Sequence, residues 1–228
     1  MSKSGLLCPA TCWLERVDGV RHIFYSQPAV FNGDRFTIQQ HVTNSKDGTP
    51  IDYVVLSPED TGDKVGKAPV LITAYGIMGI SIMIRYMDLM LGGISLVPWL
   101  ERGGSLVIAL VRGGGEREPD WHEAARQTKR QNSYEDFIAV SKELIRSWMT
   151  AAEHLGVFGV SSGGLLSAVV GIQRPDLFGV VVSDVPMTDM LRYPKMGMGG
   201  AWIDEYGDPE DPEMANVLRA YSPFHNVR

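Results

Sequence analysis

The chain has 228 residues, of which 44% are hydrophobic and 21% charged, and its formal net charge is -6. This length suits one α/β domain with a sizeable core, and the composition is ordinary for a globular protein. The negative net charge argues against a nucleic-acid partner, because phosphate binding needs clustered Lys and Arg, and the charges are also mixed in sign along the chain.

The cysteines, the N-terminal residues and one uncharged segment bear on the class of protein. Cys8 and Cys12 are the two cysteines, and they predict neither a disulfide framework nor a metal site, because no second Cys or His pair lies nearby. The first residues do not resemble a signal peptide, so we expect a cytoplasmic protein. We also expect that the protein uses no cofactor. Residues 155–172 lack charge, but their glycines and serines predict a buried strand and helix rather than a membrane span.

The first 60 residues predict short strands. Residues 21–25 are strand-like, and we interpret residues 1–30 as the edge of another unit. Residues 36–42 and 51–57 alternate in polarity and flank the turn sequence Ser45-Lys46-Asp47-Gly48, which predicts an antiparallel hairpin. A polar loop is expected over 59–67.

The rest of the chain alternates buried strands with helices. Short apolar runs predict strands buried on both faces of a mostly parallel sheet, at residues 69–74, 105–111, 155–160 and 180–183. Residues 134–148 have apolar side chains at helical spacing, with Asp or Ser before them as a candidate cap. A second helix over 165–173 ends before Pro175. The alternation predicts an open, doubly wound α/β sheet.

The strongest local signal is Gly159-Val160-Ser161-Ser162-Gly163, placed between a predicted strand and a predicted helix. This context is what a G-x-S-x-G nucleophile elbow requires. A serine in so sharp a turn takes a strained backbone, and the flanking glycines avoid collisions with the neighbouring strand and helix. The Ser162 N–H then faces the place where an oxyanion forms. The alternative is a glycine-rich turn with an ordinary serine.

A second glycine-rich stretch, Arg112-Gly113-Gly114-Gly115-Glu116, follows the predicted strand at 105–111. It lacks the spacing of nucleotide-binding loops. We interpret it as a tight loop at the active-site end of the sheet.

Many blocks together resemble the catalytic domain of the prolyl oligopeptidases, serine peptidases that cut short peptides after proline. The resemblance runs from about Phe31 to the last residue, and the blocks are collinear: Ser45-Lys46-Asp47-Gly48, Ala74-Tyr75-Gly76, Trp99-Leu100-Glu101-Arg102-Gly103-Gly104, Arg112 to Glu116, Trp121-His122, Gln131-Asn132 with Asp136-Phe137, the elbow, Gln173-Arg174-Pro175-Asp176-Leu177-Phe178, Asp189-Met190, Trp202 with Glu205-Tyr206-Gly207, and Tyr221-Ser222-Pro223-Phe224-His225-Asn226-Val227.

The resemblance implies an α/β-hydrolase fold and a role for each matching residue. Ser161 matches the nucleophile, and Tyr75 matches the tyrosine whose hydroxyl joins the oxyanion hole beside the Ser162 N–H. Trp202 matches the tryptophan that stacks on the substrate proline, and Tyr206 matches another pocket wall. A flat aromatic ring suits this rigid, apolar substrate ring. Met78 and Met187 fall at pocket-lining positions.

Two positions depart from the family pattern. The usual Tyr-Gly-Gly-Phe is Tyr75-Gly76-Ile77-Met78 here, so a flexible thioether replaces an aromatic pocket residue. The asparagine that often follows the nucleophile is Ser162. Both changes bear on proline specificity rather than on the ancestry of the elbow.

The family's triad acid and base have no counterpart in this sequence. Both follow the Ser-Pro-x-His-Asn block in the family, whereas this chain stops at Arg228. We therefore expect an α/β-hydrolase sheet that is incomplete at its C-terminal end, over residues 31–228. The resemblance implies that residues 1–30 are a remnant of the last strands of a β-propeller with a linker.

Three readings follow from the absent acid and base. The first is a truncated prolyl oligopeptidase-like peptidase that is inactive alone. The second is a non-catalytic protein that reuses the pocket to bind proline-containing peptides. The third is an active hydrolase whose triad is either rearranged or completed by a partner chain. For a rearranged triad, Asp184 and His225 are the local candidates beside Ser161. An open sheet edge also predicts self-association.

Overall fold

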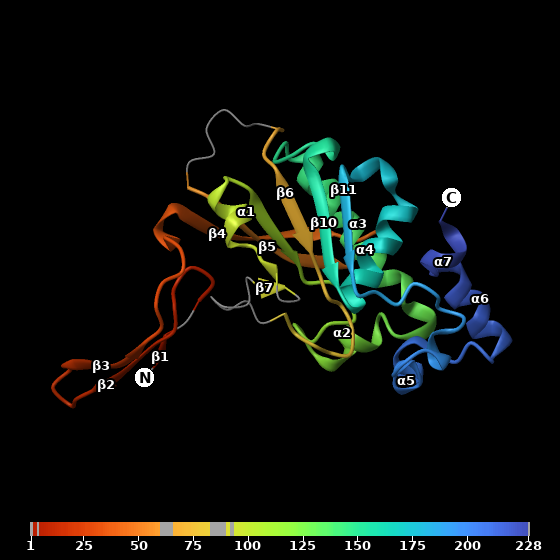
Figure 1. The fold of residues 1–228 in the computed structure, drawn as a ribbon, viewed down its shortest axis with the longest axis horizontal. Helices are drawn as coiled ribbons and strands as arrows, with labels where there is room; N and C mark the ends of the chain where they lie inside the picture. The colour runs from red at the N-terminus through yellow and green to blue at the C-terminus, as the bar shows by residue number, and fades with distance from the viewer. Residues whose placement is uncertain (1, 4, 60–65, 83–89, 92–93, 228) are drawn as a thin grey trace.

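The computed structural model describes residues 2–3, 5–59, 66–82, 90–91 and 94–227, and most of the predicted loop at 59–67 lies outside these ranges. The fold is built on a six-stranded sheet in the order β11-β10-β6-β9-β5-β4 (Figure 1). Its strands are β4 (Phe36–Asn44), β5 (Pro50–Pro58), β6 (Val70–Thr73), β9 (Ser105–Ala109), β10 (Leu155–Val160) and β11 (Val180–Asp184).

The strand directions agree with the sequence prediction. β4 and β5 form an antiparallel hairpin, and β5 pairs antiparallel with β9. The strands β9, β6, β10 and β11 are all parallel. This confirms a mostly parallel sheet whose antiparallel hairpin closes one side.

Two apolar clusters cover the two faces of the sheet. Successive side chains of a strand point to opposite faces, and in β9 Val107 and Ala109 join one cluster whereas Leu106 and Ile108 join the other. The first cluster packs under the helices α3 (Gln131–Arg146) and α4 (Ser162–Gln173). The second packs under the short helix α1 (Val97–Glu101).

Helix α3 begins three residues earlier than the sequence prediction, and the predicted polar cap is wrong. Its N-cap position is Arg130, whose side chain makes no capping hydrogen bond, and a 3-10 turn (Gln127–Lys129) leads into it. Ser133 lies in the first helical turn and donates instead to the Arg112 carbonyl at 2.5 Å. Trp148 lies beyond the helix with a φ of 61°.

The uncharged segment 155–172 forms a strand and a helix, as predicted. β10 ends at Val160 and α4 begins at Ser162, so a sharp turn interrupts the apolar stretch. Among the described residues, no helix is both long and apolar enough to cross a membrane.

The N-terminal residues form a separate three-stranded sheet of β1 (Ser2–Lys3), β2 (Thr11–Glu15) and β3 (Arg21–Ser26). Figure 1 shows it projecting away from the body, and Phe24 on it is 79% exposed. Leu6, between β1 and β2, is buried in the second cluster and anchors this unit to the body. Its assignment to a propeller remnant stays an interpretation.

Short elements complete the described fold. A small hairpin is made of β7 (Met90–Leu91) and β8 (Ile94–Ser95). The remaining α-helices of the described residues are α2 (Pro119–Glu123), α5 (Ile203–Tyr206), α6 (Pro212–Tyr221) and α7 (Pro223–Asn226). On the opposite side of the body from the N-terminal sheet lie α5, α6 and α7 (Figure 1).

The outer edge of β11 is unpaired within the described part of the chain. Three valines of this strand, Val180, Val181 and Val182, are 53%, 42% and 39% exposed. Self-association through this edge stays a prediction.

A buried ion pair ties the hairpin to the centre of the fold. The Arg112 guanidinium donates to both carboxylate oxygens of Asp136, at 2.6 and 2.9 Å, and Asp136 is fully buried. Ser45 donates to the same carboxylate at 2.5 Å, and Arg112 also reaches Asp47 at 2.6 Å. The turn after β4, the loop after β9 and helix α3 therefore meet at one guanidinium.

Replacing Asp136 by asparagine should destabilise the protein strongly. The variant leaves a buried guanidinium without its main counter-charge, which costs about 3 kcal/mol or more. Urea unfolding followed by circular dichroism measures the change. The matched control is Asp176→Asn, because Asp176 forms an exposed pair with Arg174, and exposed pairs contribute little to stability. Equal losses in both variants would contradict the anchoring role of the buried pair.

The pH dependence of the free energy of unfolding should reveal the contribution of the Asp47–Arg112 interaction. The hydrogen bond from Arg112 lowers the pKa of Asp47 to about 2, below the value of about 3.9 in unfolded chains. The stabilisation is therefore complete above about pH 4 and disappears as the pH falls through 2.

Because the Asp47 side chain is 47% exposed, its contribution should be on the order of 1 kcal/mol or less. The free energies of unfolding of the wild type and of Asp47→Asn should differ at pH 7 and converge near pH 2. A difference that does not change with pH would contradict the assignment.

Candidate active site

Ser161 occupies the turn between β10 and α4 in a strained conformation. Its φ is 57° and its ψ is -117°, a region that L-residues rarely adopt. Its backbone N–H donates to the Asp184 carbonyl at 2.9 Å, and its own carbonyl accepts from the Leu165 N–H at 3.0 Å. Hydrogen bonds on both sides thus hold the strained residue between β11 and the first turn of α4.

The glycines around Ser161 permit this turn, as the sequence predicted. A Cβ added at Gly159 would lie 1.9 Å from the Gly163 carbonyl oxygen, and one added at Gly163 would lie 2.7 Å from the Ala74 carbonyl oxygen. A Cβ at Gly164 would lie 2.6 Å from the Asp184 carbonyl oxygen. Strand, helix and neighbouring loops approach so closely that a side chain at any of these positions must displace backbone.

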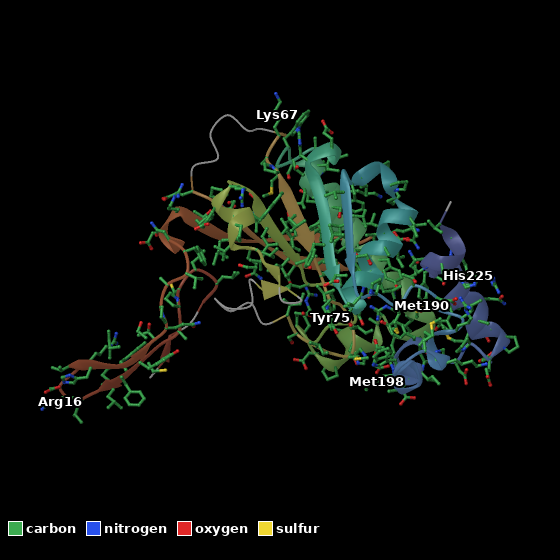
Figure 2. All side chains as sticks on the ribbon, in the orientation of Figure 1. Arg16, Lys67, Tyr75, Met190, Met198 and His225 are labelled. Carbon is green, nitrogen blue, oxygen red and sulfur yellow. The ribbon has the colours of Figure 1, made fainter. Side chains whose placement is uncertain are left out.

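Tyr75 lies beside the elbow. It follows β6, is half-buried against the first apolar cluster, and its ring lies 3.8 Å from the position of a Cβ on Gly163. Figure 2 shows Tyr75 at the carboxyl ends of the strands, where open α/β sheets bind ligands. Gly76, next in the chain, has a φ of 58° and turns the loop under the Gly113 backbone.

Ser162 and Tyr206 are joined directly. The Tyr206 hydroxyl donates to the Ser162 Oγ at 3.0 Å. Burial raises the pKa of Tyr206 to about 12, so the phenol stays protonated and remains a donor. Tyr206 is 1% exposed, and its ring therefore packs within the core. Sequence reasoning missed this bond, because no local pattern brings residues 44 positions apart together.

The remaining candidate pocket residues differ in their burial. Trp202 and Met187 are half-buried and pack against the first cluster. Met78 lies on the Tyr75 loop with a φ of 56° and is 36% exposed. Their pocket-lining roles stay predictions. Met78 lies on the segment after β6, Met187 lies on the segment after β11, and Trp202 is the last residue of the 3-10 turn Gly199–Trp202.

The rearranged triad gains no support from the geometry. His225 lies on α7, at a distance from Tyr75 in Figure 2, and its Nδ1 is hydrogen-bonded to the Ser222 Oγ at 2.9 Å. Among the described residues, no hydrogen bond joins a histidine to Ser161; His41 and His122 bond to Gln39 and Glu205. Asp184 meets Ser161 through its backbone carbonyl.

Sequence reasoning also missed a buried arginine beneath the site. Arg130 is 2% exposed, and its guanidinium donates to the Glu205 carboxylate at 3.3 Å and to the Gly76 carbonyl. Glu205 also bonds His122 at 2.7 Å. A signal was present, because Glu205 and His122 stand in recognised blocks and Arg130 directly precedes another. Only their proximity in space joins them.

Comparison with known proteins decides the family. Residues 94–228 match the model of the prolyl oligopeptidase family, which is more than half of the chain. The chain belongs to the prolyl oligopeptidase family. Its fold is accordingly the α/β-hydrolase fold expected from the sequence.

Curated relatives are similar over nearly the whole chain. A prolyl endopeptidase of Elizabethkingia miricola is 33% identical over 100% of this chain and 32% of its own length. An uncharacterized peptidase of Sinorhizobium fredii is 40% identical over 98% of this chain and 30% of its own length. This prolyl oligopeptidase-family chain thus spans about a third of the relatives that it matches.

Solved structures give the same result. A post-proline cleaving enzyme from Rickettsia typhi is 35% identical, with a TM-score of 0.89 over 100% of this chain and 32% of that one. Prolyl oligopeptidase B from Galerina marginata, bound to a 25mer macrocyclization substrate, is 28% identical with a TM-score of 0.83, again over 100% and 32%.

Adding a single methyl group at the elbow should be harmful. Gly159→Ala places a Cβ against the backbone of α4, and overpacking of this kind costs about 1–3 kcal/mol. Urea unfolding measures the loss. Gly200→Ala is the matched control, since its Cβ meets an ordinary contact of 3.5 Å, and its effect should stay within about 0.5 kcal/mol. An unaffected Gly159→Ala variant would show that the elbow is more open than the structure has it.

Proposed function

We propose that this chain supplies the nucleophile, the oxyanion hole and the proline pocket of a serine peptidase that cleaves short peptides after proline. The observation that carries the proposal is the strained Ser161 at the β10–α4 turn, with Tyr75 beside it. Family membership supports the reaction class, because Ser161 and Tyr75 both stand in blocks that match the family.

In the proposed reaction the Ser161 Oγ attacks the carbonyl carbon of the proline residue. Negative charge then develops on the carbonyl oxygen, and the Ser162 N–H and the Tyr75 hydroxyl donate hydrogen bonds to it. The start of α4 adds a favourable dipole at this point. Tyr206 takes no part as a donor to this oxygen while its hydroxyl is bonded to the Ser162 Oγ.

Substrate recognition is assigned to the apolar residues around the elbow. We propose that the proline ring stacks on Trp202, with Met78 and Met187 beside it. The thioether of Met78 is flexible and fits rings of varied shape better than a fixed aromatic side chain. Tyr206, the other matched wall residue, is buried and bonded through its hydroxyl to the Ser162 Oγ.

The proton of Ser161 needs a base, and this requirement separates binding from turnover. In the described structure the side chain of His225 is bonded to Ser222, and the other histidines precede the elbow in sequence. A serine without its base retains only the effects of binding and of the oxyanion hole. We therefore propose that the chain by itself binds proline peptides without rapid hydrolysis.

Structures of a relative support the proposal that peptide binding is separable from hydrolysis. Prolyl oligopeptidase B from Galerina marginata has been solved with bound peptide substrates as variants in which an aspartate, a serine or a histidine is replaced by alanine. In that protein, substrate binding therefore tolerates each replacement.

The purified chain should not hydrolyse a proline-ended chromogenic peptide faster than its Ser161→Ala variant. It should nevertheless bind the corresponding product peptide in calorimetry, and Trp202→Ala should weaken this binding by about tenfold, because most of the apolar contact is lost. Trp148→Ala is the control, since Trp148 is exposed and lies outside the site.

A peptidyl-proline boronate distinguishes a peptidase site from a mere peptide binder. The Ser161 Oγ adds to boron at pH 9 and its proton passes to solvent, so the wild type should bind the boronate at least tenfold more tightly than the peptide. Ser161→Ala should abolish this preference. Equal affinities in the wild type would favour the non-catalytic binder, and no binding of either compound would refute the proposed function.

A further inference from the structure

A series of buried polar contacts lies next to the candidate site. Arg130 and Glu205 are 2% and 6% exposed and form an ion pair at 3.3 Å. The second oxygen of Glu205 bonds the His122 Nε2 at 2.7 Å. The Arg130 guanidinium also donates to the Ser133 Oγ at 3.1 Å and to the Gly76 carbonyl.

At one end of this series of polar contacts, Arg130 holds the loop that carries Tyr75. The Gly76 carbonyl that accepts from Arg130 belongs to the residue directly after Tyr75. Farther along the loop, a Cβ on Gly79 would lie 3.8 Å from the His122 ring. Arg130 therefore holds the loop by a hydrogen bond at Gly76, and the His122 ring lies close to the loop at Gly79, on the other side of Met78.

At the other end of the series, the contacts hold helix α5, which carries Tyr206. Glu205 is its neighbour in α5, and the preceding Asp204 carbonyl accepts from Arg126 at 2.7 Å and from Gln127 at 3.0 Å. The Arg130 guanidinium also lies 5.8 Å from the centre of the Tyr206 ring. Helix α5 is thus fastened to the same segment that supports the Tyr75 loop.

A buried ion pair of this kind contributes little net stability compared with apolar packing, and in some proteins its role is to specify the relative position of the parts it joins. Loop 75–79 and helix α5 are separated by more than 120 residues in the chain. We propose that Arg130 is a positioning residue that sets the Tyr75 hydroxyl relative to the proline pocket. This inference rests on the proposed function, in which Tyr75 serves the oxyanion and Trp202 the proline.

The consequence is energetic coupling between Arg130 and Tyr75. With Arg130 in place, the Tyr75 hydroxyl points at the oxygen of a tetrahedral adduct, and its removal loses a charged hydrogen bond. Without Arg130, the Gly76 carbonyl loses its donor and the loop is released from α5. The hydroxyl then contributes little, whether or not it is present.

A double-mutant cycle in the full 228-residue chain tests this coupling. The measured quantity is the ratio of the affinities for peptidyl-proline boronate and for the matching peptide. Tyr75→Phe should lower this ratio about tenfold in the wild type. In Arg130→Met the same change should lower it by less than about threefold, and in Arg130→Lys the effect should be intermediate. Arg146→Met, which removes an exposed ion pair with Glu143, should leave the tenfold effect intact.

Glu205→Gln serves as a second variant if Arg130→Met does not unfold cooperatively, because it keeps the size of the side chain and weakens the hold on Arg130. It too should reduce the effect of Tyr75→Phe. An unchanged tenfold effect in either folded variant would show that Arg130 is merely structural and would overturn the inference while leaving the proposed function intact. A wild type that shows no boronate preference would overturn both.

Discussion

The backbone of Ser161 is held in a conformation that its side chain disfavours, and the surrounding structure supplies the constraint that maintains it. The turn exists because β10 and α4 approach without intervening Cβ atoms at Gly159 and Gly163, and because β11 accepts the Ser161 N–H through Asp184. A packed sheet and a packed helix are both required to outweigh local strain of about 1–3 kcal/mol. The elbow is thus a product of the core rather than of the motif alone.

Two buried arginines connect this rigid centre to the loops around it. Arg112 gathers the β4–β5 turn, the loop after β9 and α3 around Asp136. Arg130 gathers the loop after Tyr75 and helix α5 around Glu205. Loops have few apolar contacts of their own, so charged hydrogen bonds to a guanidinium are an effective way to fix their geometry. The polar interior therefore positions the candidate site, while the apolar clusters stabilise the sheet.

The proposed division between binding and turnover has a physical basis in the same arrangement. In the proposed function, the elbow and the Tyr75 loop carry the oxyanion donors, and Trp202, at the end of the 3-10 turn Gly199–Trp202, carries the main apolar contact to the substrate. Proton removal from Ser161 requires a further side chain in hydrogen-bonding reach, and the described His225 is bonded to Ser222 instead. Family membership thus applies to the architecture of the chain, and its activity is a separate, measurable property.

The sequence alone determined the hairpin, the buried parallel strands and the elbow. Each depends on a pattern that spans only a few residues: alternating polarity for the hairpin, apolar runs for the buried strands and closely spaced glycines for the elbow. The start of α3 was misjudged, since a polar residue in its first turn bonds a distant carbonyl rather than the helix end. The Tyr206–Ser162 bond and the Arg130–Glu205–His122 contacts were decided by the tertiary structure alone. They join residues 44 to 83 positions apart, and no short-range pattern records which buried polar groups will satisfy one another once the sheet has brought its loops together.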